Sequence, residues 1–245
     1  MRSAFFSTPP LLLTSLTTLF FSMLAHAESD NFSQNYQQPT RGFMIENGAV
    51  SGLGKVSAEL YSGSGNLDSG GGIRLGLSNA ELILNSNSNA NGQNDLLLKW
   101  AMKDYKLNAE TSHVINWSAL GGVSHLDSDT VDSFSFQFGA SATIDADAAS
   151  FTISPTLVHI DINDVDDTYL NFGLGAHVGV IDTTSGLFSL GAEAIITTQD
   201  DQDNLFAFGA RWSYNERVNI DLVPLILGGT DIKGLPGIVR LNIVF

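Results

Sequence analysis

The 245-residue sequence has no cysteine, little positive charge and only one long apolar run. Without cysteine the chain forms neither a disulfide nor a lipid-modified N-terminal cysteine. Outside residues 11–24 no stretch approaches the roughly 20 apolar residues of a membrane-spanning helix, so we expect no helical span. Lysine and arginine number 11 against 26 aspartates and glutamates, and the net charge is −15. Because such a chain repels other polyanions, we expect no nucleic-acid partner.

The apolar run belongs to a predicted signal peptide over residues 1–27. Arg2 precedes the run, and Ala25 and Ala27 occupy the two positions that a signal peptidase reads. Cleavage after Ala27 makes Glu28 the first residue of the mature chain. Residues 28–40 are polar and show no periodicity, so we interpret them as a flexible periplasmic leader.

From residue 41 onward, apolar and small polar residues alternate with a period of two. Phe134, Phe136 and Phe138, for example, alternate with Ser135 and Gln137. Such alternation predicts antiparallel β-strands with one apolar and one polar face. In a soluble sandwich the apolar faces pack on a core, whereas in a membrane barrel they face lipid, and the local pattern fits both.

The end of the chain favours the barrel. Val239, Leu241, Ile243 and the terminal Phe245 lie on one face of a predicted strand. In water such an exposed terminal strand is an aggregation hazard, but in a closed barrel it is paired on both sides and faces lipid. This pattern resembles the insertion signature of Gram-negative outer-membrane β-barrels, and the segment 208–212 is loosely similar to small uncharacterised barrels of the YfaZ type.

The resemblance implies an all-β transmembrane barrel over residues 41–245 in the cell outer membrane. It also implies outer-membrane lipid, lipopolysaccharide and the barrel-assembly machinery as partners. Eleven strands are predicted, at residues 48–61, 70–84, 95–106, 116–126, 133–144, 149–162, 168–181, 187–199, 204–214, 217–227 and 237–245. Single-chain barrels have an even number. We therefore expect about 12 strands with a further strand in Arg41–Glu46, or 10 if the first half is divided too finely. Pro155 and Pro224 predict local bulges, because neither donates to a strand ladder.

Acidic clusters recur in three predicted loops at the outer rim. Their members are Asp127, Asp129, Asp132, Asp164, Asp166, Asp167, Asp200, Asp201 and Asp203. Carboxylates gathered on one rim suit weakly bound Ca²⁺ or Mg²⁺, the one cofactor we consider. Their spacing lacks the glycine and closing glutamate of an EF-hand loop, and aspartate is also an ordinary soluble turn residue, which we favour.

A ring of charge is predicted inside the barrel, because one charged residue on each of the last five strands falls on the lumen face. These residues are His177, Glu193, Arg211, Asp221 and Arg240. Arg74, Lys99 and Lys103 are candidates to join them from the first half. Such a ring acts either as a selectivity filter or gate, or as mutually neutralising pairs that close the lumen. We favour the pairs, because acids and bases interleave.

Three functions follow from these patterns. The leading one is a non-enzymatic barrel, either structural or a narrow porin-like pore. The second is an outer-surface binding or adhesion protein that uses the acidic loops and the Asn-rich stretch 85–94. The third is an outer-membrane hydrolase built on His125 with Asp127 or His159 with Asp161, and it is the weakest because no known barrel-hydrolase motif is present. We therefore predict no catalytic residues.

Overall fold

The computed structural model describes residues 40–64, 67, 69–87, 92–106, 114–127, 132–146, 148–163, 165–184, 186–200, 202–214, 217–229, 231–234 and 237–245. The predicted signal peptide, with Ala25 and Ala27, and residues 28–39 lie outside this part. No helix of the described residues has the length and apolarity to cross a membrane.

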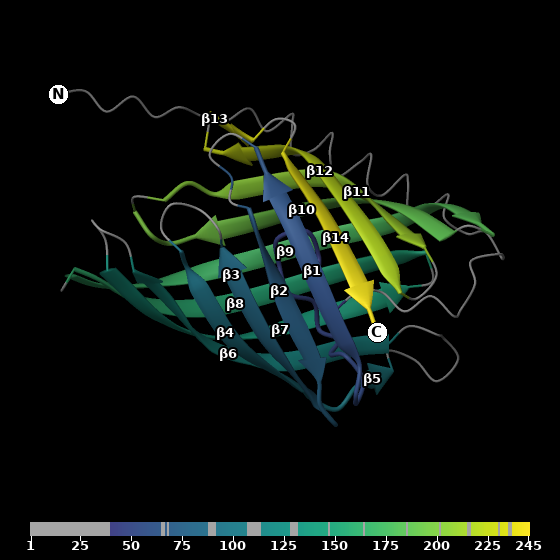
Figure 1. Ribbon diagram of the computed structural model, residues 1–245, viewed down its shortest axis with the longest axis horizontal. Helices are drawn as coiled ribbons and strands as arrows, with labels where there is room; N and C mark the ends of the chain where they lie inside the picture. Colours follow the sequence, from purple (N-terminus) through teal and green to yellow (C-terminus); the bar gives the residue numbers. More distant parts are fainter. Residues whose placement is uncertain are drawn as a thin grey trace.

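Twelve strands of the described chain close into one antiparallel barrel (Figure 1). In chain order they are β1 (Val56–Gly63), β2 (Gly70–Gly76), β3 (Ala80–Asn87), β4 (Asn94–Ala101), β6 (Val114–Asp127), β7 (Asp132–Ala146), β8 (Ala149–Ile162), β9 (Val165–Thr183), β10 (Gly186–Thr197), β11 (Leu205–Tyr214), β12 (Val218–Gly228) and β14 (Ile238–Val244). The ring closes because β14 pairs with β1 on one side and with β12 on the other. Two short strands lie off the ring: β5 (Tyr105–Lys106) pairs with β6, and β13 (Asp231–Gly234) pairs with β12.

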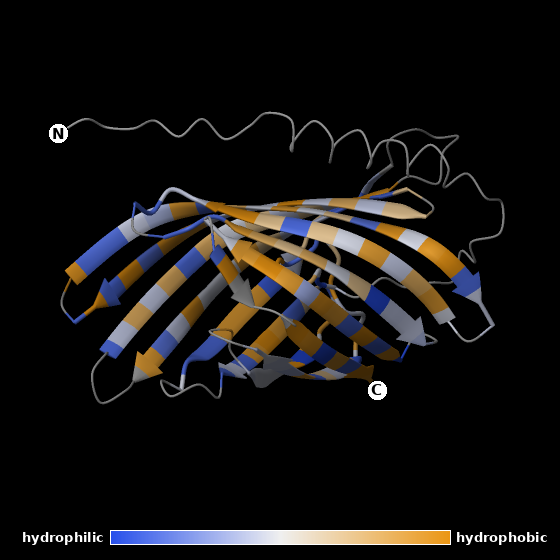
Figure 2. Ribbon diagram, turned by 90° about the horizontal axis from the view of Figure 1, so that it is seen from above, coloured by the Kyte–Doolittle hydropathy of each residue, from blue (hydrophilic) through white to orange (hydrophobic). Residues whose placement is uncertain are grey.

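The barrel is apolar outside and polar inside. Apolar and polar bands alternate along many of the strands, as Figure 2 shows. Phe138, which points outward, is 63% exposed, whereas Lys99 and Glu81, which point inward, are fully buried. An apolar exterior around a polar interior is the reverse of a soluble protein and is the arrangement of a transmembrane barrel. The predicted fold class, with 12 strands, is confirmed.

The twelfth strand is not the predicted one. Arg41–Glu46 is no barrel strand, and β1 begins only at Val56 rather than at residue 48. Instead, the predicted strand 70–84 is two strands, β2 and β3, joined by the turn at residues 77–79. This turn has neither glycine nor proline, and its signal in the sequence is a change of parity, from Ile73 and Leu75 before it to Leu82 and Leu84 after it.

The two prolines affect the sheet differently. Opposite Pro224 the pairing of β11 with β12 shifts between Phe208 and Ala210, which is the predicted bulge. Beside Pro155 the ladder between β7 and β8 skips two residues, but the register is the same on both sides of the gap. His159 therefore stays on the outward face, with Phe136 as its cross-strand partner.

Candidate functional site

Residues 40–47 form a tight hairpin inside the barrel, which we call the lumen hairpin. The N–H of Gly42 donates to the carbonyl of Ile45 at 2.8 Å, and Arg41 and Glu46 form an antiparallel bridge. Thr40 and Ser51, on either side of the hairpin, both donate to the Glu81 carboxylate. The chain therefore enters the lumen at the level of Glu81, turns at Phe43 and Met44, and returns to the same level before β1 begins.

One wall carboxylate holds the turn. Glu193 accepts the N–H groups of Phe43 at 2.5 Å, Met44 at 2.6 Å and Ile45 at 3.1 Å. The ring of His177 lies against the same carboxylate, with 2.7 Å between His177 Nε2 and Glu193 Oε1. A single buried acid thus satisfies three successive backbone donors, which is a strong and geometrically demanding arrangement.

Wall cations hold the hairpin carbonyls. Arg211 donates to the carbonyls of Arg41 at 3.2 Å and Gly42 at 3.3 Å. Arg240 donates to the carbonyl of Phe43 at 2.8 Å. Lys99 donates to the carbonyl of Thr40 at 2.7 Å, and Ser141 to that of Glu46 at 2.5 Å. Cations and hydroxyls from four separate strands therefore bind main-chain oxygens.

The two charged side chains of the hairpin face opposite charges on the wall. Arg41 pairs with Glu59, and Glu46 accepts from Arg74 at 2.6 Å and from Lys99 at 3.3 Å. Burial by itself raises the pKa of Glu46, but the positive charges of Arg74 and Lys99 outweigh it and hold this pKa well below its usual range. Glu46 is therefore an anion at neutral pH.

Apolar contacts complete the site at the tip. Phe43 is almost fully buried against Ala207, Val223 and Ile226, and its ring meets that of His177 edge-on at 4.7 Å. Arg211 lies over the face of the Phe43 ring, with its Cζ 5.4 Å from the ring centroid.

Close backbone approach depends on glycine at the end of the hairpin. Gly48 donates its N–H to Thr143 Oγ1 at 2.8 Å. A Cβ at Gly48 would overlap the backbone carbonyl of Asn116 in β6. Because a backbone group of a barrel strand cannot move aside, no larger residue fits while the hairpin is docked.

The wall beneath the hairpin has two parts. Eight neighbouring strands carry buried charges that alternate in sign around the barrel: Glu193, Arg211, Asp221, Arg240, Glu59, Arg74, Glu81 and Lys99. We call this the charged arc. Strands β6 to β8 instead carry buried hydroxyls, which we call the hydroxyl arc: Ser118, Ser141, Thr143, Ser150, Thr152, Ser154 and Thr156.

All five residues of the predicted charge ring lie in the lumen and contact one another or the hairpin. Arg211 donates to both oxygens of Asp221, at 2.5 and 2.9 Å, and Arg240 lies 3.4 Å from the same carboxylate. Of the candidates from the first half, Arg74 and Lys99 join them, whereas Lys103 is exposed beyond the end of β4. Sequence reasoning missed Arg41, Glu46, Glu59 and Glu81. For Glu59 and Glu81 the signal was a lumen-facing charge whose neighbouring strands carry the opposite charge.

The predicted acidic clusters share the end of the barrel opposite the C-terminus. Asp132 lies 3.5 Å from His125, and Asp167 accepts from Gln199 at 2.8 Å. Asp166, Asp200 and Asp203 belong to the same end, and Asp127 pairs with Asp132 through the backbone. Asp129, Asp164 and Asp201 lie outside the described residues, and within those residues no group of three or more acids or histidines is placed to hold a metal. The cation site stays a prediction.

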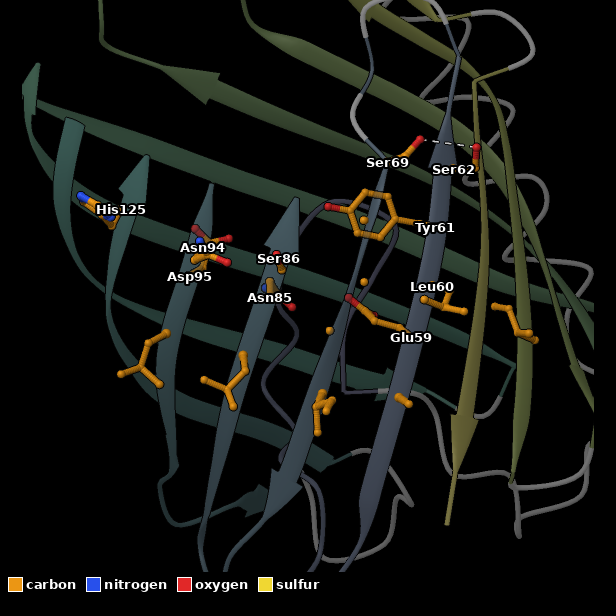
Figure 3. Close-up of a pocket in the computed structure, with 18 of the residues that line it drawn as sticks. Glu59, Leu60, Tyr61, Ser62, Ser69, Asn85, Ser86, Asn94, Asp95 and His125 are labelled. Carbon is orange, nitrogen blue, oxygen red and sulfur yellow. Dashed lines mark hydrogen bonds between the residues drawn. The ribbon is translucent and has the colours of Figure 1, made fainter. Parts of the chain in front are cut away.

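The outer wall has a hollow of its own, of about 1160 Å³, along β1 to β4 (Figure 3). Leu60, Ile73, Leu84 and Leu96 line it, and all four are exposed on the outward face. Val239 and Leu241 of the predicted insertion signature border it, and Phe245 follows on the same face. The hollow is therefore part of the lipid-facing surface and not a route through the lumen.

No protein-family model and no curated protein sequence matches the chain. Among solved structures, a KdgM porin has 8% identity and a TM-score of 0.46 over 78% of this chain and 98% of its own. A NanC porin has 11% identity and a TM-score of 0.45 over 77% of this chain and 97% of its own. A bacterial polysaccharide outer membrane secretin has 9% identity and a TM-score of 0.37 over 80% of this chain and 99% of its own. The closed barrel with its apolar exterior, rather than these distant likenesses, makes the chain a transmembrane β-barrel of the outer-membrane type.

Proposed function

We propose that the protein is a non-enzymatic outer-membrane channel for small solutes, closed in this conformation by the lumen hairpin. The observation that carries the proposal is the position of the hairpin across the charged arc, where Glu193, Arg211 and Arg240 all bind its backbone. A barrel of this strand number lies between small filled barrels and wide porins, so one short hairpin suffices to fill its lumen.

The chemistry of the wall favours a removable plug over a permanent core. A structural barrel gains most from apolar side chains in its interior. Here the wall behind the hairpin consists mainly of charges and hydroxyls, with Ala207, Val223 and Ile226 as an apolar patch around Phe43. If the hairpin leaves, these groups are hydrated by water, and the lumen becomes a polar passage.

The same geometry supports a role without catalysis. His125 and His159 are both on the outward face near the rim, and His159 is hydrogen-bonded to Thr168 at 2.9 Å. The buried acids of the lumen are engaged by cations or by backbone N–H groups. The surface-binding alternative stays a prediction, since residues 88–91 of the Asn-rich stretch and three of the rim aspartates lie outside the described residues.

Single-channel recording of refolded protein tests the proposal with a matched pair of substitutions. Gly48→Ala forces the hairpin away from β6, because its Cβ would overlap the Asn116 carbonyl. Gly52→Ala is the control, because a Cβ there comes no closer than 3.9 Å to any atom. We expect steady conductance from Gly48→Ala and closed channels from the wild type and Gly52→Ala.

Heat-modifiable gel mobility shows whether each variant has folded. A folded Gly48→Ala barrel that does not conduct would contradict the plug, and so would a wild type that conducts as well as the variant.

A further inference from the structure

We propose that the charged arc is a binding site for short peptides that adopt a tight turn, and that the lumen hairpin occupies it as an internal ligand. This inference rests on the proposed channel, because it names the class of solute that the open lumen would bind.

Most contacts between wall and hairpin are made to the main chain. Glu193 takes three N–H groups, while Arg211, Arg240 and Lys99 together take four carbonyls. Main-chain contacts of this kind do not depend on the side chains of the bound segment. Three successive N–H groups reach one anion only where the backbone turns, as in the anion-binding turns of other proteins. The arc therefore offers acceptors and donors in the spacing that a peptide backbone requires.

The charged arc also favours peptides that carry both a basic and an acidic side chain. Glu59 binds Arg41 of the hairpin, and Arg74 binds its Glu46. A simple anion or a simple cation would meet as many like charges as opposite ones, because the wall charges alternate from strand to strand. A peptide with one basic and one acidic side chain satisfies both signs at once. The apolar pocket at Ala207, Val223 and Ile226 adds room for an aromatic side chain between them.

The tether explains why the site is filled. The hairpin is joined to β1 through residues 48–55 and so competes at an effective concentration on the order of millimolar. A free peptide gains access only when the hairpin is loosened. Gly48→Ala, which loosens it without altering the arc, is therefore the protein to use.

The test adds a synthetic peptide of residues 40–49 to full-length Gly48→Ala in two parallel measurements. One is block of single-channel current, and the other is fluorescence anisotropy of the labelled peptide with refolded protein in detergent. We expect reversible block and saturable binding, and much weaker binding to the wild type, whose own hairpin competes.

Two altered peptides identify what is recognised. A peptide N-methylated at Phe43 and Met44 loses two donors to Glu193 while keeping every side chain, and should bind about tenfold or more weakly. A peptide with Arg41 and Glu46 exchanged has the same composition but meets like charges, and should weaken similarly.

The outcomes separate the two proposals. A variant that conducts but shows no peptide block or binding would overturn the peptide site and leave the channel intact. Equal binding of the native and N-methylated peptides would also overturn it. A variant that binds the peptide but does not conduct would overturn the channel alone.

Discussion

The charged arc and the hydroxyl arc line the same lumen, yet they treat the hairpin differently. The charged arc, which runs from β10 through β12 and β14 to β1 and on to β4, binds the hairpin through ionic groups. The hydroxyl arc contacts it through Ser141 and Thr143. The strands differ as well: the eight strands of the charged arc have 7 to 12 residues, and β6 to β8 of the hydroxyl arc have 14 or 15. A short wall that makes specific contacts thus faces a tall wall that is merely polar. The contrast teaches that lumen polarity alone does not define a site, and that paired charges do.

The largest difference between the arcs should appear in stability. Asp221→Asn keeps the shape of the side chain but leaves Arg211 and Arg240 without their shared buried anion. Loss of one partner from a buried ion pair costs about 3–5 kcal/mol. Ser118→Ala is the matched change in the hydroxyl arc, where the buried hydroxyl has no hydrogen-bond partner among the described residues, and should change stability little. Urea unfolding followed by gel mobility measures both, and similar midpoints would remove the distinction.

A smaller difference should appear in gating. Glu193→Gln replaces a charged acceptor of three N–H groups, and charge-assisted hydrogen bonds contribute about 1.5–3 kcal/mol. Thr143→Val removes a neutral acceptor of one N–H, from Gly48, worth about 0.5–1.5 kcal/mol. We expect open probability to rise roughly ten- to hundredfold in the first and only a few-fold in the second. Single-channel recording decides, and the reverse order would place the main latch on the hydroxyl arc.

The smallest effect should come from moderate acid. The pKa of Glu46 is lowered when the hairpin is docked, so its contribution to docking is present above its ordinary pKa and is lost only as pH falls through the docked value. Because Arg74 and Lys99 hold that value well below the usual range, the Glu46 contact should be unchanged between pH 7 and 5. Glu46→Gln should open the channel at pH 7. If acid at pH 5 reproduces the Glu46→Gln phenotype, the charge assignment at Glu46 is wrong.

Much of the barrel was predictable because period-two alternation is a local signal. The parity of Arg211, Asp221 and Arg240 already placed them on one face, and the apolar residues of β14 placed the other face in lipid. The hairpin was not predictable in this way. Phe43, Met44 and Ile45 form a short apolar run between Arg41 and Glu46, and such a run does not distinguish a short strand from a buried turn. Only the tertiary contacts with the charged arc distinguish the lumen hairpin from a barrel strand.

The position of the hairpin also bears on how the barrel assembles. It lies directly before β1, and β1 meets β14 at the seam that joins the first strand to the last. Glu59 on one side of this seam and Arg240 on the other both grip the hairpin. In a barrel whose first and last strands have not yet paired, Glu59 and Arg240 are therefore exposed to water. They are buried only when β14 pairs with β1. The hairpin is synthesised before every barrel strand, but its binding site is complete only when the last strand has paired with the first. Stable docking of the hairpin therefore requires a correctly closed barrel.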